Sequence, residues 1–183
     1  MIRRLGCLSA LLSLLFFVVV VGSIGWFGYQ AYLHATDAQA VASRTNEVGQ
    51  AWTDDPAAVA KALGGKGGVR PRNLSSQPFQ QIGARATTAY RSAGTTLTLT
   101  SSQLTCHERP LTSELVETPV SVLVLVHPEN SWLPDVSGMW AQLRGGNSCT
   151  AASGPLTVKV TLETPVGRRI VVDAVTGESV AGR

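Results

Sequence analysis

The sequence predicts an α+β fold carried on one N-terminal transmembrane helix, and three observations support this. A long apolar run follows the first four residues, helix signals fill residues 37–94, and strand periodicity takes over from Thr95. Helices that precede a run of strands are typical of the α+β class. The 183 residues are enough for one domain and an appendage.

The apolar run predicts a transmembrane anchor over residues 5–33. It contains no Asp, Glu, Lys or Arg between Leu5 and Thr36, and a hydrocarbon core of ~30 Å requires about 20 apolar helical residues. A cleaved signal peptide is the alternative, but its apolar region spans only about 7–15 residues. The best small-residue cleavage motif, at 38–40, lies well beyond the run. Aromatic side chains gather at the far end, where an interfacial belt is expected: Trp26, Phe27, Tyr29 and Tyr32.

Charged residues on the two sides of the anchor predict its orientation. Arg3 and Arg4 precede it, whereas the other flank begins with Asp37 and has its first basic residue at Arg44. Because basic residues stay on the cytoplasmic side, Arg3 and Arg4 are the topology signal, and we expect residues 1–4 in the cytoplasm. The protein is therefore expected in the cell membrane as a single-pass protein with the bulk of its chain extracytoplasmic.

The charge of the exported part argues against a nucleic-acid partner. The chain has 15 Lys and Arg residues and 12 Asp and Glu residues, and without Arg3 and Arg4 the basic count falls to 13. The exported part is thus nearly neutral, whereas nucleic-acid binding usually requires a clustered basic face.

Ala-rich sequence predicts that the helix continues past the membrane as a stalk over residues 34–52, so that residues 53–183 form the exported α+β domain. The domain is expected to begin with a short helix. Asp55 suits its N-cap, Pro56 suits its first position and Gly64 suits its end.

Two further segments complete the predicted helical part. Residues 64–73 form a Gly-rich basic loop, and we expect a flexible connection because no apolar strand precedes it and the phosphate-binding pattern is missing. A third helix is expected from Ser76, which can cap it, to Gly94, which can end it. Its apolar stripe would pack on the core: Phe79, Ile82, Ala86, Ala89 and Tyr90.

Strand periodicity predicts an antiparallel meander in the second half of the chain. Alternating Leu and Thr predict a half-buried strand over residues 95–105. The unbroken aliphatic run over residues 119–127 predicts a central strand covered on both faces. Three more strands are expected, the last two as a hairpin: 139–146, 156–163 and 168–175.

The order of these elements resembles the NTF2-like fold, in which helices pack on a curved antiparallel sheet to form a cone. The resemblance covers most of residues 50–176 and rests on PFQQIGARATTAYRSAG, TTLTLTSSQLT, PVSVLVLV and LTVKVTLETPVGRRIVVDAV. A single anchor, an Ala-rich stalk and such a domain also resemble the Mce-associated membrane proteins of actinobacteria and related conjugation-apparatus proteins. A shorter segment, IVVDAVTGESV, resembles the strand–turn end of PepSY domains.

We expect a non-enzymatic interaction or assembly module of a cell-envelope complex, with the lipid bilayer and other envelope proteins as partners. NTF2-like proteins include both enzymes and scaffolds, so the fold alone does not choose a function. A small-ligand or enzymatic pocket is one alternative, and a PepSY-like regulator of an exported protease is another.

Cys106 and Cys149 predict a disulfide. They are the two cysteines outside the anchor, and cysteines in an oxidising compartment are expected to pair. The bridge would enclose 42 residues, which corresponds to a stabilisation of about 3–4 kcal/mol on the loop-entropy model.

Two alternatives give Cys106 a chemical role. A zinc site could use the neighbouring His107 and Glu108, but the usual ligand spacing is missing. A nucleophile–base pair would need His34 or His127 beside the thiol, and nothing in the sequence brings them together.

Trp132 and Trp140 lie in a loop-rich segment and are candidate contacts for a partner, with a cover over the open end of the core as the alternative. The acidic residues have ordinary structural explanations, so no catalytic residue, cofactor or metal site is expected. Asp54 and Asp55 suit a helix cap, and Asp135 and Asp173 suit turns. Glu114 and Glu117 suit a solvated edge.

Overall fold

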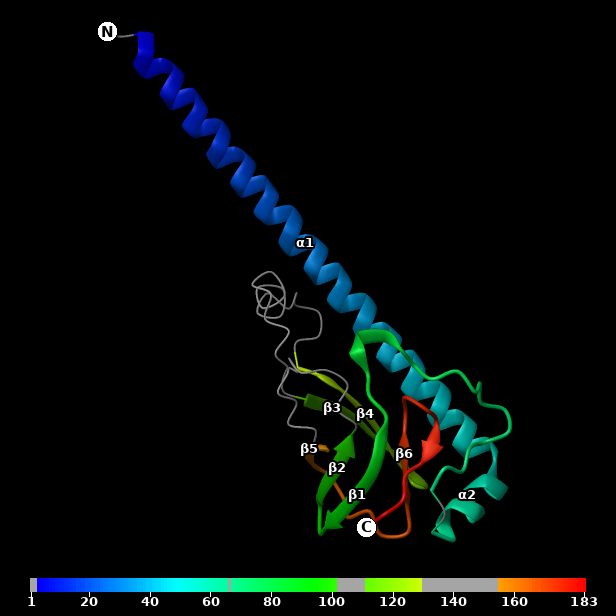
Figure 1. Cartoon of the computed structure of the whole chain (residues 1–183). Helices are drawn as coiled ribbons and strands as arrows, with labels where there is room; N and C mark the ends of the chain where they lie inside the picture. Colours follow the sequence, from blue (N-terminus) through cyan, green and yellow to red (C-terminus); the bar gives the residue numbers. More distant parts are fainter. Residues whose placement is uncertain (1–2, 66, 102–110, 130–154) are drawn as a thin grey trace. The chain divides into compact units, whose positions relative to one another are not determined.

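The computed structural model describes residues 3–65, 67–101, 111–129 and 155–183. The chain divides into two compact units, Met1–Ala38 and Gln39–Arg183. The boundary falls inside helix α1 (Arg3–Asp54), which runs through the segments predicted as anchor and stalk. Figure 1 shows α1 as one uninterrupted helix, coloured from blue to cyan.

The first part of α1 presents apolar side chains on all sides. Phe16, Phe17 and Phe27 are 71%, 64% and 72% exposed. A helix that is apolar all round is either buried or a membrane span, and this part is not buried. Within the described residues, α1 is the one helix long and apolar enough to cross a membrane. By length and composition, it fits the predicted membrane anchor.

The last turns of α1 belong to the core of the second unit. Val48, Ala51 and Trp52 are almost completely buried, and they share an apolar cluster with Leu123 and Val172. This part of the predicted stalk is therefore a structural element of the folded domain.

Asp55 caps helix α2 (Pro56–Leu63) as predicted. Its Oδ1 accepts the Ala58 N–H at 3.0 Å, and Pro56 opens the helix. Its Oδ2 accepts the Arg72 N–H at 3.2 Å, so the same carboxylate also holds the Gly-rich loop. The hydrogen bond from Ala58, followed by that from Arg72, lowers the pKa of Asp55, because such bonds favour the ionised form.

The helix predicted from Ser76 to Gly94 does not form. The segment contains the short 3₁₀ turn η1 (Gln81–Gly83) and then becomes strand β1 (Thr87–Ala93). Ile82 lies at φ +55°, in the left-handed region that interrupts a right-handed helix. Tertiary pairing with the next strand has overridden the helical spacing of the apolar residues.

Gly94 ends a strand and not a helix. Its φ is +60°, and it is the first of two residues that join β1 to β2 (Thr96–Ser101) in an antiparallel hairpin. A positive φ at this position matches the type II′ turn, which favours glycine.

The strands within the described residues form two sheets, with the orders β1-β2-β5 and β3-β4-β6-β7. The single antiparallel meander predicted from the sequence is therefore wrong. Strands β4 and β6 run parallel, and β5 pairs with β2 instead of forming a hairpin with β6. The bounds of the strands not yet given are β3 Leu111–Glu117, β4 Ser121–Pro128, β5 Leu156–Thr161, β6 Ile170–Asp173 and β7 Glu178–Ser179.

An ion pair organises the connection that carries the chain from one sheet to the other. Glu117, predicted on a solvated edge, is instead largely covered, with 17% of its side chain exposed. Its carboxylate accepts the Arg169 guanidinium N–H at 2.6 Å and the Glu163 N–H at 2.6 Å. Arg169 also donates to the Thr164 and Pro165 carbonyls. These contacts explain why residues 162–169 cross over and do not form a tight hairpin.

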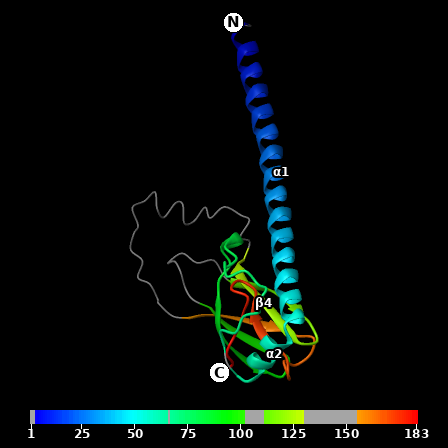
Figure 2. The ribbon, with the colours of Figure 1, turned by 90° about the vertical axis from the view of Figure 1, so that its right-hand side faces the viewer.

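Strand β4 is the predicted central strand, and this prediction is confirmed. Val122, Val124 and Val126 point into the cluster between the two sheets, whereas Leu123 points into the cluster with α1. Its two faces are therefore covered by different layers. In Figure 2, β4 lies in the middle of the domain.

The C-terminal tail joins the two sheets. Tyr90 of β1 donates its N–H to Ala181 at 3.2 Å and accepts the Arg183 N–H at 2.9 Å. At the other end, the Arg85 N–H reaches the Val126 carbonyl of β4 at 2.8 Å. The aliphatic interior between the sheets is thereby closed on the β1 side.

Replacing Glu117 by Gln tests the role of the crossover. The hydrogen bond from Arg169 lowers the pKa of Glu117 from its ordinary value of 4.5. The stabilisation from this ion pair is therefore present above pH 4.5 and is lost as the pH falls through the lowered pKa. We expect Glu117→Gln to lower the melting temperature at pH 7, with a gap to wild type that narrows in acid. Thermal unfolding at several pH values measures this. A gap independent of pH would contradict it.

Candidate functional site

Several predicted site residues lie outside the described residues. These are the disulfide pair Cys106 and Cys149, the partner-contact candidates Trp132 and Trp140, and the turn residue Asp135. The disulfide therefore stays a prediction, and peptide mapping without reduction tests it: a crosslinked peptide is expected, and two alkylatable thiols would refute the bridge. Arg3 and Arg4 lie at the start of α1, and the orientation that they predict also remains to be tested.

His127 does not show the arrangement of a general base. Its Nδ1 lies 2.9 Å from the Pro128 carbonyl oxygen, and its Nε2 lies 3.7 Å from Glu114 Oε1. Both contacts are local to the β3–β4 pair. The proposed pairing of His127 with Cys106 lies outside the described residues, because the structure does not describe Cys106.

The second half of the Gly-rich loop is docked on the C-terminal hairpin. The Ser179 N–H donates to the Val69 carbonyl at 2.8 Å, and the Val69 N–H reaches Ser179 Oγ at 3.1 Å. Arg70 and Glu178 form an ion pair at 2.8 Å. The prediction of a flexible connection is therefore wrong for this half, because backbone pairing to β7 holds it.

Asp173 is an acidic residue that is almost completely buried in the folded domain. It ends β6 and is 1% exposed. Its Oδ2 accepts the Thr176 N–H at 3.0 Å and the Thr176 hydroxyl at 2.7 Å, so the predicted turn role is confirmed. Its Oδ1 is buried and makes no hydrogen bond of ordinary geometry within the described residues, although the backbone N–H groups of Thr87 and Val175 lie near the carboxylate and oppose the rise in its pKa. Turn formation thus uses only half of this carboxylate.

Burial raises the pKa of Asp173 to about 6 from its ordinary value of 3.8. Desolvation disfavours the charged form, and the two hydrogen bonds from Thr176 oppose it only in part. At neutral pH the carboxylate is therefore largely ionised, but its charge is buried and only partly satisfied.

A cavity of about 370 Å³ lies beside Asp173. Three segments that are distant in the sequence line it: Gly67 and Gly68 of the Gly-rich loop, the start of β1, and the β6–β7 hairpin with its tail. Thr87 also lines the cavity, and its Oγ1 is buried without a hydrogen-bond partner in the described part of the chain. Two polar atoms at one cavity thus have unused hydrogen-bonding capacity.

The end of α1 holds the β6–β7 turn from the other side. Arg44 donates to the Ala174 carbonyl at 3.0 Å and to the Val175 carbonyl at 3.2 Å. Trp52 Nε1 donates to the Gly177 carbonyl at 3.2 Å. The hairpin that carries Asp173 is therefore fixed by side chains from the last turns of α1.

Gly177 tests how closely this turn is packed. Its φ is +75°, and an added Cβ would lie 2.1 Å from Leu74 Cδ2. We expect Gly177→Ala to destabilise the domain by about 2 kcal/mol through left-handed strain and crowding. Gly94→Ala is the matched control, because Gly94 has φ +60° with nothing within 4 Å of an added Cβ; it should cost only about 1 kcal/mol. Equal losses in urea unfolding would contradict the packing argument.

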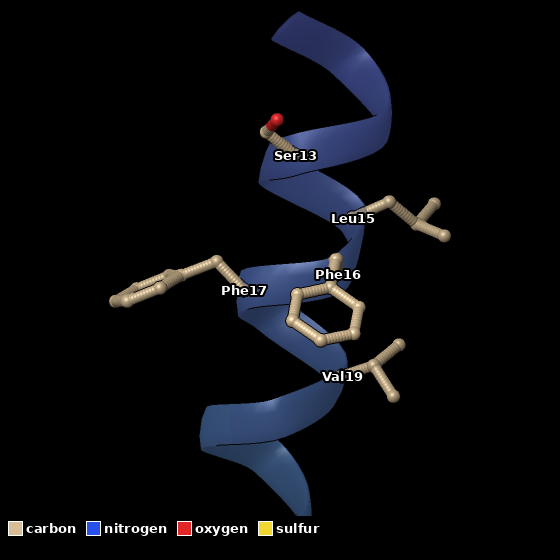
Figure 3. A pocket seen from close by; sticks show the side chains of 5 residues that line it. All are labelled: Ser13, Leu15, Phe16, Phe17 and Val19. Carbon is tan, nitrogen blue, oxygen red and sulfur yellow. The ribbon is translucent and has the colours of Figure 1, made fainter. Parts of the chain in front are cut away.

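A second hollow lies on the surface of the first part of α1 (Figure 3). The side chains that line it radiate from a single helix and are apolar except for one hydroxyl: Ser13, Leu15, Phe16, Phe17 and Val19. Binding sites for small polar ligands require convergent polar groups. This hollow is therefore the uneven apolar surface of a helix suited to lipid.

The described residues include no group of three or more His, Cys, Asp or Glu side chains that could hold a metal ion. The lining of the Asp173 cavity offers two carboxylates, Asp173 and Glu178, and several hydroxyl groups without an imidazole or thiol. Such a set can accept hydrogen bonds from a donor.

Sequence reasoning identified Asp173 only as a turn residue and did not predict the cavity. One signal was present in the sequence: Asp173 directly follows the apolar run 170–172. A strand with such a run is covered on both faces, so the residue that ends it is also expected to be buried. The contribution of Thr87 could not be recognised, because its segment was assigned to a helix. No family model, curated protein or solved structure matches the chain.

Proposed function

We propose that this protein is a single-pass membrane-anchored protein whose exported domain is an interaction or assembly module of a cell-envelope complex. The observation that carries the proposal is the dual character of α1. Its first part is exposed and apolar over the length that a membrane requires, whereas Val48 and Trp52 near its end are completely buried in the domain core. An anchor continuous with the core suits a protein whose task is to hold a domain at a membrane surface.

The interior of the domain supports a binding role more than a catalytic one. The cluster between the sheets consists of aliphatic side chains such as Leu97, Leu99 and Val124. Catalysis in the NTF2-like alternative would need polar or titratable groups converging in that interior. The Asp173 cavity lies where the Gly-rich loop, β1 and the β6–β7 hairpin meet, and among its described lining residues one carboxylate oxygen, Asp173 Oδ1, makes no hydrogen bond of ordinary geometry.

The NTF2-like relationship is part of this proposal. Helices α1 and α2 packed on a sheet agree with it, whereas the parallel pairing of β4 with β6 departs from the expected antiparallel sheet. The PepSY-like alternative calls for a separate C-terminal unit. It has less support, because β6 and β7 form one sheet with β3 and β4.

Purification from native membranes tests the assembly function. The full chain, tagged at its C-terminus and extracted in mild detergent, is expected to co-purify with a defined set of envelope proteins. A variant with Glu163→Gln is a suitable control, because Glu163 is exposed and contributes its backbone N–H to the crossover. Recovery of the wild-type chain alone as a monomer would overturn the assembly proposal.

Accessibility of the domain in intact cells tests the proposed orientation. Protease added outside is expected to digest the domain after residue 39 in wild-type cells. The double change of Arg3 and Arg4 to Gln removes the basic flank, so we expect part of the population to become protected. Full protection of the wild-type domain would place it in the cytoplasm and contradict the proposal.

A further inference from the structure

Two buried acceptor atoms at the cavity beside Asp173 have no hydrogen bond of ordinary geometry, although the Thr87 backbone N–H lies near enough to the Asp173 carboxylate to lower its pKa. Asp173 Oδ1 and Thr87 Oγ1 both have less than 1 Å² of accessible surface and no such hydrogen bond within the described residues. Burying a carboxylate oxygen or a hydroxyl without a hydrogen bond is costly. Buried polar atoms in native proteins normally have a hydrogen-bond partner, so two such atoms at one cavity indicate a site for a ligand that donates hydrogen bonds.

The charged groups on the surrounding elements have partners of their own. Arg70 on the Gly-rich loop pairs with Glu178 on β7 at 2.8 Å. On the other side of the hairpin, Arg44 pairs with Glu47 at 3.0 Å and donates to backbone carbonyls. Asp173 is thus the one carboxylate in the described lining of the cavity without a cationic partner.

The acceptor groups of the lining select the class of ligand. An anion is disfavoured by the two carboxylates of the lining. A calcium ion requires about six to eight oxygen ligands, several of them carboxylates, which the lining does not supply. An ammonium group carries a positive charge and several N–H donors on one small centre, which matches a carboxylate beside a hydroxyl.

We propose that this cavity binds the primary ammonium group of a small amine or of a peptide amino terminus, with Asp173 Oδ1 and Thr87 Oγ1 as its acceptors. A cavity of about 370 Å³ falls in the range of small-molecule sites. Because both acceptor atoms are covered, entry requires a small displacement at the rim. The lining includes Gly67 and Gly68, which have no side chain to displace.

Amide chemical shifts of the full chain in detergent micelles test this proposal. The probes are methylammonium chloride and the peptide triglycine. Their matched comparators are tetramethylammonium chloride, which has the charge but no N–H donor, and N-acetyl-triglycine, which lacks the ammonium group. We expect saturable shifts at residues 86–88 and 173–181 with one or both probes and not with either comparator.

Three variants assign the acceptors. Asp173→Asn is expected to weaken probe binding by about tenfold or more, because a charge-assisted hydrogen bond is lost. Thr87→Val keeps the β-branched shape of a strand residue and should weaken binding by roughly threefold. Thr98→Val is the control for the same chemical change on β2, away from the cavity lining, and should leave binding unchanged.

The outcomes distinguish a small amine from a peptide amino terminus as the ligand, and they include results that would overturn the proposal. Binding of triglycine without methylammonium identifies a peptide amino terminus, and the reverse identifies a small amine. Equal shifts with tetramethylammonium, no saturable shift with either probe, or full binding by Thr87→Val would overturn the proposal. Because Thr87→Val retains the strand-forming shape, this test does not depend on the folding of Asp173→Asn.

Discussion

Truncating Trp52 to Ala is expected to destabilise the domain by about 3–5 kcal/mol, the usual cost of removing a large buried aromatic side chain. Trp52 is completely buried in the core that α1 shares with the sheet. Its Nε1 also donates to the Gly177 carbonyl, which the truncation would leave without this donor. Chemical denaturation of the full chain in detergent, followed by circular dichroism, measures the loss.

Trp52→Phe is the matched control for this prediction. Phenylalanine retains most of the apolar volume but has no N–H group, so we expect a loss of about 1–2 kcal/mol from the unmet carbonyl and a small cavity. If Trp52→Ala costs no more than Trp52→Phe, the end of α1 is not an integral part of the core. The last turns of α1 would then not hold the domain to the apolar first part of the helix.

The sequence was informative wherever local chemistry decides the structure. The α2 cap depends on Asp55 and Pro56, which act within one turn, and it was predicted correctly. The apolar length of α1 and the aliphatic run of β4 also determine their elements without help from distant residues. In each case the residues that carry the signal are neighbours in the chain.

The errors arose where distant segments decide the structure. The apolar residues of the Ser76–Gly94 segment have helical spacing, but backbone pairing to β2 makes the second half of this segment a strand. The turn between β5 and β6 was predicted as a hairpin, because the ion pair of Glu117 with Arg169 spans 52 positions and cannot be recognised in either segment alone. The periodicity of apolar residues is a local property of the sequence and contains no information about such long-range contacts.

The candidate site follows the same division. The turn role of Asp173 is local, since its acceptor bonds reach only Thr176, and it was predicted. Its burial and its cavity depend on β1 and on the Gly-rich loop, which approach it only in the folded domain. A site at a seam between three segments is therefore found from structure and not from a motif.

Replacing Asp173 by Asn is expected to remove a pH dependence from the stability of the domain. The pKa of Asp173 is about 6 in the folded protein against an ordinary value of 3.8, so the folded state binds the proton more tightly. The stabilisation is thus fully present below pH 3.8 and is lost as the pH rises through 6. A shift of this size corresponds to about 3 kcal/mol between the two limits.

We expect Asp173→Asn to be more stable than wild type at pH 7, by up to about 3 kcal/mol, and similar to it at pH 4. The amide oxygen can still accept both hydrogen bonds from Thr176, and the amide nitrogen replaces the unpaired oxygen. Urea unfolding of the full chain between pH 4 and pH 7 measures the difference between variant and wild type, in which the opposite acid dependence of Asp55 and Glu117 cancels. Asp54→Asn is the control, because Asp54 is exposed. A difference that stays constant across this range would show that burial of Asp173 does not govern its ionisation.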